Sequence, residues 1–247
     1  METLFISDLH LSPARPDKLA LFRQLLRGPA RQASALYVLG DLFEEFWVGN
    51  DDTTPPNPEI VRELADYTGN GGKLFLQKGN RDLLLDEGFG ELTGGMILAD
   101  KALIDLYGKP VLVMHGDLLC SRDRKYQVYR RLVANPVTQG IFAVLPYRLR
   151  ILISHGLKPM MKQSTMQKPE DIMDVVQTTV EQTMRANKVT ELIHGHTHRP
   201  GLHEFGLDGK PAKRVVLGDW YGEDLILVCR GEDRKLIPVR DYLQQRR

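Results

Sequence analysis

The chain has 247 residues, of which 42% are hydrophobic and 26% are charged. This length and composition fit one large α/β domain with an insertion. The formal net charge is +1, so the total charge gives no argument for nucleic-acid binding. Its two cysteines, Cys120 and Cys229, make no disulfide framework and suit a reducing cytosol. The N-terminus METLFISDLH lacks the features of a signal peptide, and no run reaches the roughly 18–20 apolar residues of a membrane span, so a cytoplasmic protein is expected.

Short apolar runs alternate with amphipathic stretches along the chain. The runs rich in Val, Ile, Leu and Phe predict strands at 3–7, 35–40, 73–79, 110–116 and 189–193. Helical periodicity predicts helices around 16–27, 57–68 and 169–186. This alternation is typical of an α/β sandwich.

Each predicted strand is followed at once by polar side chains of the metal-binding kind. The segments are SDLH at 7–10, GD at 40–41, GNRD at 79–82, HGD at 115–117 and HGHTH at 194–198. A single Asp after a strand is often a helix N-cap, and HGHTH alone also fits a polar surface loop. Because sites in open α/β sheets assemble at the carboxyl ends of the strands, five such ends together predict one convergent site.

The candidate ligands mix oxygen and nitrogen and include no cysteine. They are Asp8, His10, Asp41, Asn80, His115, His196 and His198. This mix suits Mn²⁺, Fe²⁺ or Zn²⁺ and argues against a structural zinc held by cysteines. Seven ligands are too many for one transition ion. They suit two ions about 3.5–4 Å apart that share a carboxylate, with a bridging water or hydroxide as nucleophile.

The order of these segments resembles the calcineurin-like metallophosphoesterases, whose pattern is DxH, GDxx(D/E), GNH(D/E), H and GHxH. The matching segments are DLH at 8–10, GDLFE at 40–44, GNRD at 79–82, His115 and GHTH at 195–198. The resemblance implies a four-layer αββα sandwich with a dinuclear site at one edge. It assigns Asp8, His10 and His198 to one metal, Asn80, His115 and His196 to the other, and Asp41 as the bridge. His194 lies outside the pattern and is expected in the core or behind the ligands.

Arg81 stands where most of this family has a histidine that helps the transition state or the leaving group. Arginine is a poor proton donor, but it can hold a phosphate oxygen bidentately. A leaving group that is itself a phosphate monoester needs little protonation. The substitution therefore favours hydrolysis of a pyrophosphate bond.

Further segments resemble the UDP-2,3-diacylglucosamine pyrophosphohydrolases of lipid A biosynthesis. They are GDLFEEFWVGNDD (40–52), HGDLLCSRDRKYQVYRRLVANP (115–136), IMDV (172–175), GHTHRP (195–200) and VVLGDWY (215–221). The resemblance implies two Mn²⁺ ions per chain and water attack on the α-phosphorus of UDP-2,3-diacylglucosamine, giving lipid X and UMP. It implies Asp41, Asn80, Arg81 and His196 as catalytic residues, and substrate contacts from Asn80, Arg81, Asp123, Ser164, Lys168 and His196. This chain has CSRD, with Arg122 in place of the first of two acids in the family.

The stretch between the fourth strand and the helix at 169–186 is basic and amphipathic. Between Leu118 and Lys168 the chain has ten Lys and Arg against one acid, Asp123. We expect a helical insertion at 122–168 that forms a lipid-binding cap, on a core of 1–121 and 169–247. It also fits an ordinary solvated helical excursion, or a nucleic-acid surface that uses Tyr126, Tyr129 and Tyr147, but the aliphatic excess favours lipid.

The sequence as a whole predicts a monomeric Mn²⁺ hydrolase without a nucleic-acid partner, peripheral on the cytoplasmic face of a bacterial inner membrane. One alternative is another dinuclear metallophosphoesterase, such as a nucleotide phosphodiesterase or a nuclease. A non-catalytic scaffold of the same fold is the second alternative, although such proteins usually lose ligands. Trp47 fits a ligand contact and core packing equally well.

Overall fold

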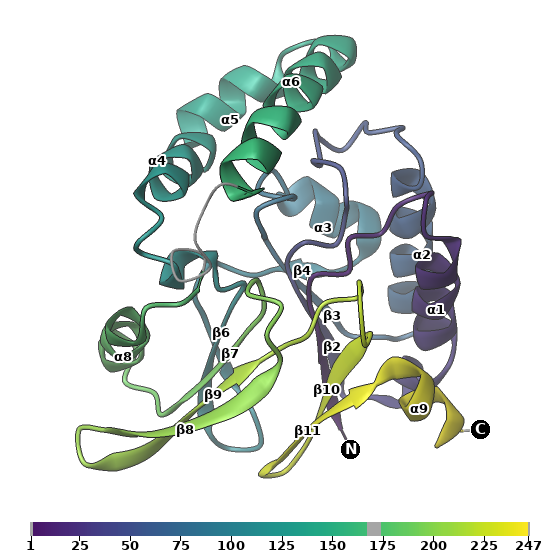
Figure 1. Ribbon diagram of the computed structural model, residues 1–247. Coiled ribbons are helices and arrows are strands. Elements are labelled where there is room, and N and C mark those ends of the chain that lie inside the picture. The colour runs from purple at the N-terminus through teal and green to yellow at the C-terminus, as the bar shows by residue number, and fades with distance from the viewer. Residues whose placement is uncertain (1, 167–173, 247) are drawn as a thin grey trace.

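The computed structural model describes residues 2–166 and 174–246, with side chains at 2–157 and 174–246, and contains two β-sheets packed face to face (Figure 1). The first sheet has the strand order β11-β10-β1-β2-β3-β4, and the second has β5-β6-β7-β9-β8. The first comprises β1 (Thr3–Ile6), β2 (Ala35–Leu39), β3 (Leu74–Gln77), β4 (Met96–Ile97), β10 (Leu225–Arg230) and β11 (Asp233–Pro238). The second comprises β5 (Ala102–Asp105), β6 (Pro110–Met114), β7 (Glu191–His194), β8 (Gly201–Leu207) and β9 (Lys210–Val216).

Both sheets are parallel at their centres. Strands β1 to β4 pair in parallel, as do β6, β7 and β9, whereas β5, β8 and β10 join antiparallel. The five strands predicted from the sequence are confirmed as β1, β2, β3, β6 and β7. Their carboxyl ends therefore lie together at the edge where the predicted ligands follow.

Alternating side chains of the buried strands face different layers. In β1, Leu4 packs toward the helices on one side and Phe5 packs between the two sheets. Residues on the outer face of the second sheet, such as Leu192, pack against the helix that contains Val180. The layers are thus helix, sheet, sheet and helix, and the predicted four-layer αββα fold is confirmed. The helices are α1 (Pro16–Arg27), α2 (Asn57–Gly69), α3 (Glu87–Thr93) and α9 (Val239–Gln244) on the first sheet, and α8 (Gln177–Ala186) on the second.

The helix expected over 169–186 begins later than its periodicity suggested. Helix α8 starts at Gln177, and Val176 has an extended backbone with ψ of 116°. The Val176 amide donates to the Leu119 carbonyl at 3.0 Å, in the short helix η2 (Asp117–Leu119), which ties this segment to the end of β6. Residues 167–173 lie outside the described part of the chain.

Three helices fill the described part of the basic stretch and stand over the carboxyl edges of the sheets (Figure 1). They are α4 (Arg124–Val133), α5 (Pro136–Ala143) and α6 (Tyr147–Met166), and we call them the cap. Two of the cap's arginines face inward rather than outward: Arg130 pairs with Asp117, and Arg150 pairs with Asp51. Among the described residues, no helix combines the length and the apolar character that crossing a bilayer requires.

A buried ion pair joins the two sheets at the end opposite the cap. Arg234 of β11 donates from Nε to Glu191 of β7 at 2.6 Å, and both side chains are buried.

We expect Glu191→Ala to lower the free energy of unfolding of the metal-free protein by about 3–5 kcal/mol, because it leaves a buried guanidinium unpaired. Urea denaturation with EDTA present measures it. Glu232→Ala, which breaks an exposed pair with Lys109, is the control and leaves stability unchanged; equal midpoints for both variants would contradict the assignment.

Candidate metal centre

Several of the predicted ligands share an unusual backbone conformation. Left-handed φ angles are uncommon outside glycine and cluster at functional sites. Backbone hydrogen bonds hold these turns: the Asp8 amide donates to the Gly40 carbonyl at 3.1 Å, and the His10 amide to the Asp41 carbonyl at 3.0 Å. Five of the seven have such angles, namely Asp8 (55°), His10 (46°), Asp41 (52°), His196 (71°) and His198 (55°).

Two glycines beside the ligands leave no room for a side chain. A Cβ atom at Gly79 would lie 2.3 Å from the Asp41 Oδ1 atom. A Cβ atom at Gly195 would lie 2.0 Å from Ser7 Oγ and 2.3 Å from Asp8 Oδ2. The loops after separate strands therefore approach one another as closely as the backbone permits.

Asp8 and Asp41 lie at the centre of the arrangement. Asp8 Oδ1 is 3.2 Å from His198 Nε2. The two oxygens of Asp41 face different histidines, with Oδ2 at 3.6 Å from His10 Nε2 and Oδ1 at 3.8 Å from His115 Nε2. The structure brings Asp8, His10 and His198 within metal-binding reach of one another, and likewise Asp8, Asp41 and His115.

Asn80 and His196 complete the set on the other side of Asp41. His115 Nδ1 donates to the Leu39 carbonyl at 2.8 Å, so its Nε2 atom faces the site and can bind a metal once deprotonated. That Nε2 atom lies 3.2 Å from Asn80 Oδ1 and 3.1 Å from His196 Nδ1. All seven predicted ligands thus meet at one edge of the molecule.

The charges of the buried carboxylates favour binding of a cation in the cluster. Burial raises the pKa of Asp82, and the neighbouring Asp41 carboxylate raises it further, to about 6. Burial lowers the pKa of His115, but the carboxylates of Asp41 and Asp8 outweigh burial and raise it to about 9. In the described chain, the His10 Nε2 atom is buried without a hydrogen-bond partner. A buried ligand atom without a partner and surplus carboxylate charge fit a divalent ion.

Three carboxylates to which the sequence analysis gave no role lie against the predicted ligands or the turns beside them. Asp82 accepts hydrogen bonds from the backbone amides of Leu42 at 2.8 Å and Gly79 at 2.5 Å. Asp219 Oδ2 lies 2.8 Å from His198 Nδ1, and Glu44 Oε2 lies 3.4 Å from His10 Nδ1. All three stand in motifs that the sequence highlights, but a motif alone does not separate a ligand from the carboxylate that orients it.

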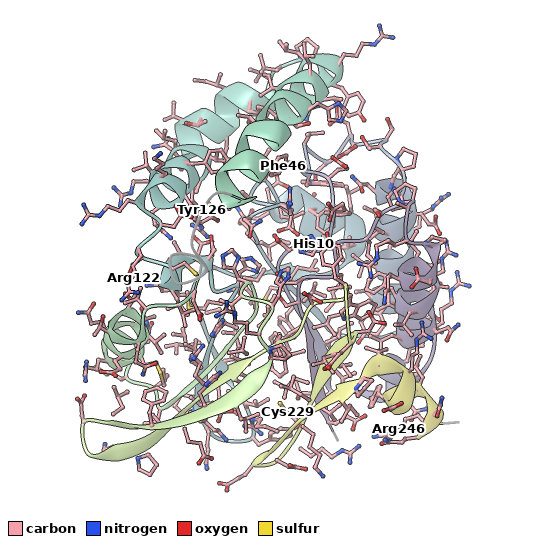
Figure 2. All side chains as sticks on the ribbon, viewed as in Figure 1. His10, Phe46, Arg122, Tyr126, Cys229 and Arg246 are labelled. Atoms are coloured by element: carbon pink, nitrogen blue, oxygen red, sulfur yellow. The ribbon has the colours of Figure 1, made fainter. Side chains whose placement is uncertain are left out.

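Arg81 lies at the boundary between the ligands and the cap. Its amide donates to Asp41 Oδ1 at 2.8 Å, and its guanidinium lies 5.4 Å from the centroid of the Phe46 ring. The Arg81 Nε atom is buried without a hydrogen-bond partner in the described structure. In Figure 2, Phe46 lies between His10 and the cap helices, and Tyr126 stands at the lower end of the cap.

The other predicted substrate contacts have mixed outcomes. Asp123 is the N-cap of α4 and accepts from the Tyr126 amide at 3.1 Å. Ser164 is in α6, but its side chain lies outside the described residues, as does Lys168 altogether. Trp47 is 1% exposed and stacks on Phe43 with centroids 4.9 Å apart, so it packs in the core.

An apolar cavity of about 180 Å³ opens between the cap and the core beside Asn80 and Arg81. Trp47 contributes one edge to its wall. Cap and core both supply its apolar side chains, including Phe46, Leu84, Tyr129, Phe142, Ile153 and Leu157. A hydrophobic compartment therefore adjoins the edge of the cluster of predicted ligands.

The chain belongs to the calcineurin-like phosphoesterase family, which it matches over residues 1–200. Relatives of nearly equal length have a more particular name. The UDP-2,3-diacylglucosamine hydrolase of Aeromonas hydrophila is 43% identical over 96% of this chain and 98% of its own. The hydrolase of the same name from Vibrio parahaemolyticus is 47% identical over 96% of this chain and 97% of its own length. A solved phosphoesterase from E. coli aligns with a TM-score of 0.49 at 19% identity, covering 98% of this chain and 94% of that one.

The family match and the identity to the two hydrolases confirm both family resemblances noted in the sequence. The family match and the two groups of converging ligands together support a divalent-metal site.

Asp219 is expected to orient His198 for the metal. Asp219→Asn weakens the acceptor at His198 Nδ1, and loss of such a partner typically weakens metal affinity about 10–100-fold. Isothermal titration with Mn²⁺ measures the dissociation constant. Asp208→Asn, at an exposed aspartate that pairs with Arg185, is the matched control and is expected to bind as the wild type does. Equal affinity of Asp219→Asn and the wild type would rule out the orienting role.

Proposed function

We propose that the chain hydrolyses UDP-2,3-diacylglucosamine to 2,3-diacylglucosamine 1-phosphate (lipid X) and UMP, a step of lipid A biosynthesis. The name of its relatives supports this substrate. The main support is the apolar cavity beside Asn80 and Arg81. A substrate with two acyl chains next to a diphosphate needs an apolar compartment that adjoins a phosphate site.

We assign two Mn²⁺ ions to the centre. Asp8, His10 and His198 would hold one ion, Asn80, His115 and His196 the other, and Asp41 would bridge them. The two separate faces of the Asp41 carboxylate, toward His10 and toward His115, support the bridging role. Bound ions of this kind neutralise phosphate charge and lower the pKa of a coordinated water.

The chain's own residues bind and orient the diphosphate. Arg81 donates to oxygens of the phosphate, and its Nε atom, buried without a partner, is one available donor. Asn80 and His196 contact the phosphates from the other side. Water attacks the α-phosphorus, the bond from that phosphorus to the bridging oxygen breaks, and the bridging oxygen leaves with lipid X. Because this leaving group is a phosphate monoester, it departs without the general acid that Arg81 cannot provide.

The sugar and the acyl chains would lie on the cap side of the centre. Asp123, at the start of α4, is proposed to hold the glucosamine, with Ser164 and Lys168 beside it. The acyl chains would enter the cavity between the cap and the core. The residues 122–168 would thus act as one functional unit on a core of 1–121 and 169–247.

The outer face of the cap suits an anionic membrane surface. Val137, Ile141 and Val144 are 69%, 61% and 82% exposed. Arg131 and Arg148 are exposed near them in the sequence, and each basic residue near an anionic surface contributes about 1 kcal/mol. The enzyme is proposed to act as a monomer, peripheral on the cytoplasmic face of the inner membrane and without a nucleic-acid partner.

A comparison of two substrates tests the lipid assignment. We expect turnover of UDP-2,3-diacylglucosamine in detergent with Mn²⁺, and a kcat/KM for UDP-N-acetylglucosamine at least about a hundredfold lower, because burial of many methylene groups contributes about 0.8 kcal/mol each. Bis(p-nitrophenyl) phosphate serves as a generic phosphodiester control. Faster hydrolysis of the control than of the lipid would favour a general phosphodiesterase.

Arg81 is expected to matter for turnover far more than for folding. Arg81→Met removes the phosphate donors and should lower kcat/KM about 100-fold or more, while a buried donor without a partner contributes little to stability. Arg81→Lys keeps the charge but not the bidentate geometry, and should recover part of the loss. Steady-state kinetics and a thermal melt measure the two effects. Unchanged kinetics in Arg81→Met would remove Arg81 from the site.

A further inference from the structure

His194, the last residue of β7, fills the space between two loops that contain predicted ligands. Its side chain is fully buried. A Cβ atom at Gly116 would lie 2.8 Å from His194 Nδ1, so the ring packs against the backbone that follows His115. The Gly195 amide donates to the His115 carbonyl at 2.7 Å. The position of the ring is thus coupled to both loops.

The hydrogen bonds of His194 define a single tautomer. Its Nδ1 atom is 2.8 Å from the Gly195 carbonyl, which only accepts, so Nδ1 has the proton. Its Nε2 atom is 3.2 Å from Nη1 of Arg214, which only donates, so Nε2 supplies the lone pair.

Arg214 is an unusual residue for its position in β9. It is 8% exposed, and its Nε atom is buried without a hydrogen-bond partner. Within the described ranges 2–157 and 174–246, no carboxylate lies within salt-bridge distance of it. Arg234, by contrast, is buried with Glu191 as its partner. The charge of Asp174 acts on Arg214, but in the described chain Asp174 pairs with Arg199 instead. A buried guanidinium without a paired carboxylate destabilises a fold, so stability does not explain Arg214.

We propose that Arg214 is a positioning residue for the metal centre, which it serves by fixing His194. With its tautomer fixed, His194 holds the Gly195 carbonyl. That carbonyl precedes the left-handed turn of His196, whose amide donates to Asp8 Oδ2 at 2.8 Å. The inference rests on the assignment of His196 and His198 as metal ligands under the proposed function.

Mn²⁺ affinity tests the positioning role directly. We expect Arg214→Met to raise the Mn²⁺ dissociation constant about 10–100-fold in isothermal titration, the range for loss of a group that orients a ligand. Arg214→Lys, whose ammonium can still donate to Nε2, should bind within about threefold of the wild type. Arg234→Met is the matched control: another buried arginine, remote from the ligands, whose loss should lower the melting temperature of the EDTA-treated protein without changing affinity.

A dissociation constant for Arg214→Met within twofold of the wild type overturns the proposal, whatever its melting temperature. Should that variant fail to fold by circular dichroism, His194→Asn replaces it, because its amide keeps the donor to Gly195 but offers nothing to Arg214, and the same limits apply. Wild-type protein that binds no Mn²⁺ overturns this proposal and the metal assignment together. Mn²⁺ binding without cleavage of the lipid overturns the substrate and leaves the role of Arg214 intact.

Discussion

The structure depends on a cluster of buried carboxylates and imidazoles assembled where parallel strands end. Two like charges 4 Å apart repel by about 4 kcal/mol at an effective dielectric constant of 20, so such a cluster is costly unless cations compensate it. The fold holds the cluster together with close backbone contacts at Gly79 and Gly195 and with left-handed turns at five of the proposed ligands. The rigidity of two packed sheets holds those turns in place.

The cap is attached to this centre by charge as well as by apolar packing. Arg130 and Tyr126 of α4 both donate to Asp117, which directly follows the loop of His115. At the other end of the cap, Arg150 of α6 donates to the Val48 carbonyl at 2.7 Å, in the loop that follows Asp41. The basic character of this segment therefore has two origins: some arginines hold the cap on the core, and others remain on its exposed face. Between the two attachments lies the cavity that adjoins Arg81.

Local patterns predicted an α/β sandwich and the convergence of the proposed ligands, whereas the four layers were implied by the family resemblance. The apolar runs before Asp8, Asp41 and His115 have the length and composition of buried strands, and residues after parallel strands meet at one edge. The prediction that helix α8 begins at residue 169 was wrong. The Val176 amide donates to the Leu119 carbonyl, a tertiary contact that periodicity does not encode. The inward direction of Arg130 and Arg150, and the pairing of Arg214 with His194, also depend on distant partners.

The reaction proposed for this chain is attack of water on the α-phosphorus of a lipid-linked UDP sugar, at a centre in which Asp41 would hold metal together with His10 and His115. Its most direct test is turnover of UDP-2,3-diacylglucosamine with Mn²⁺ in H₂¹⁸O, followed by mass spectrometry of both products, with Asp41→Ala as the inactive reference. The account predicts lipid X and UMP, with the label in UMP and less than about a tenth of the rate in the variant. Label in lipid X, or a variant that keeps its rate, would contradict it.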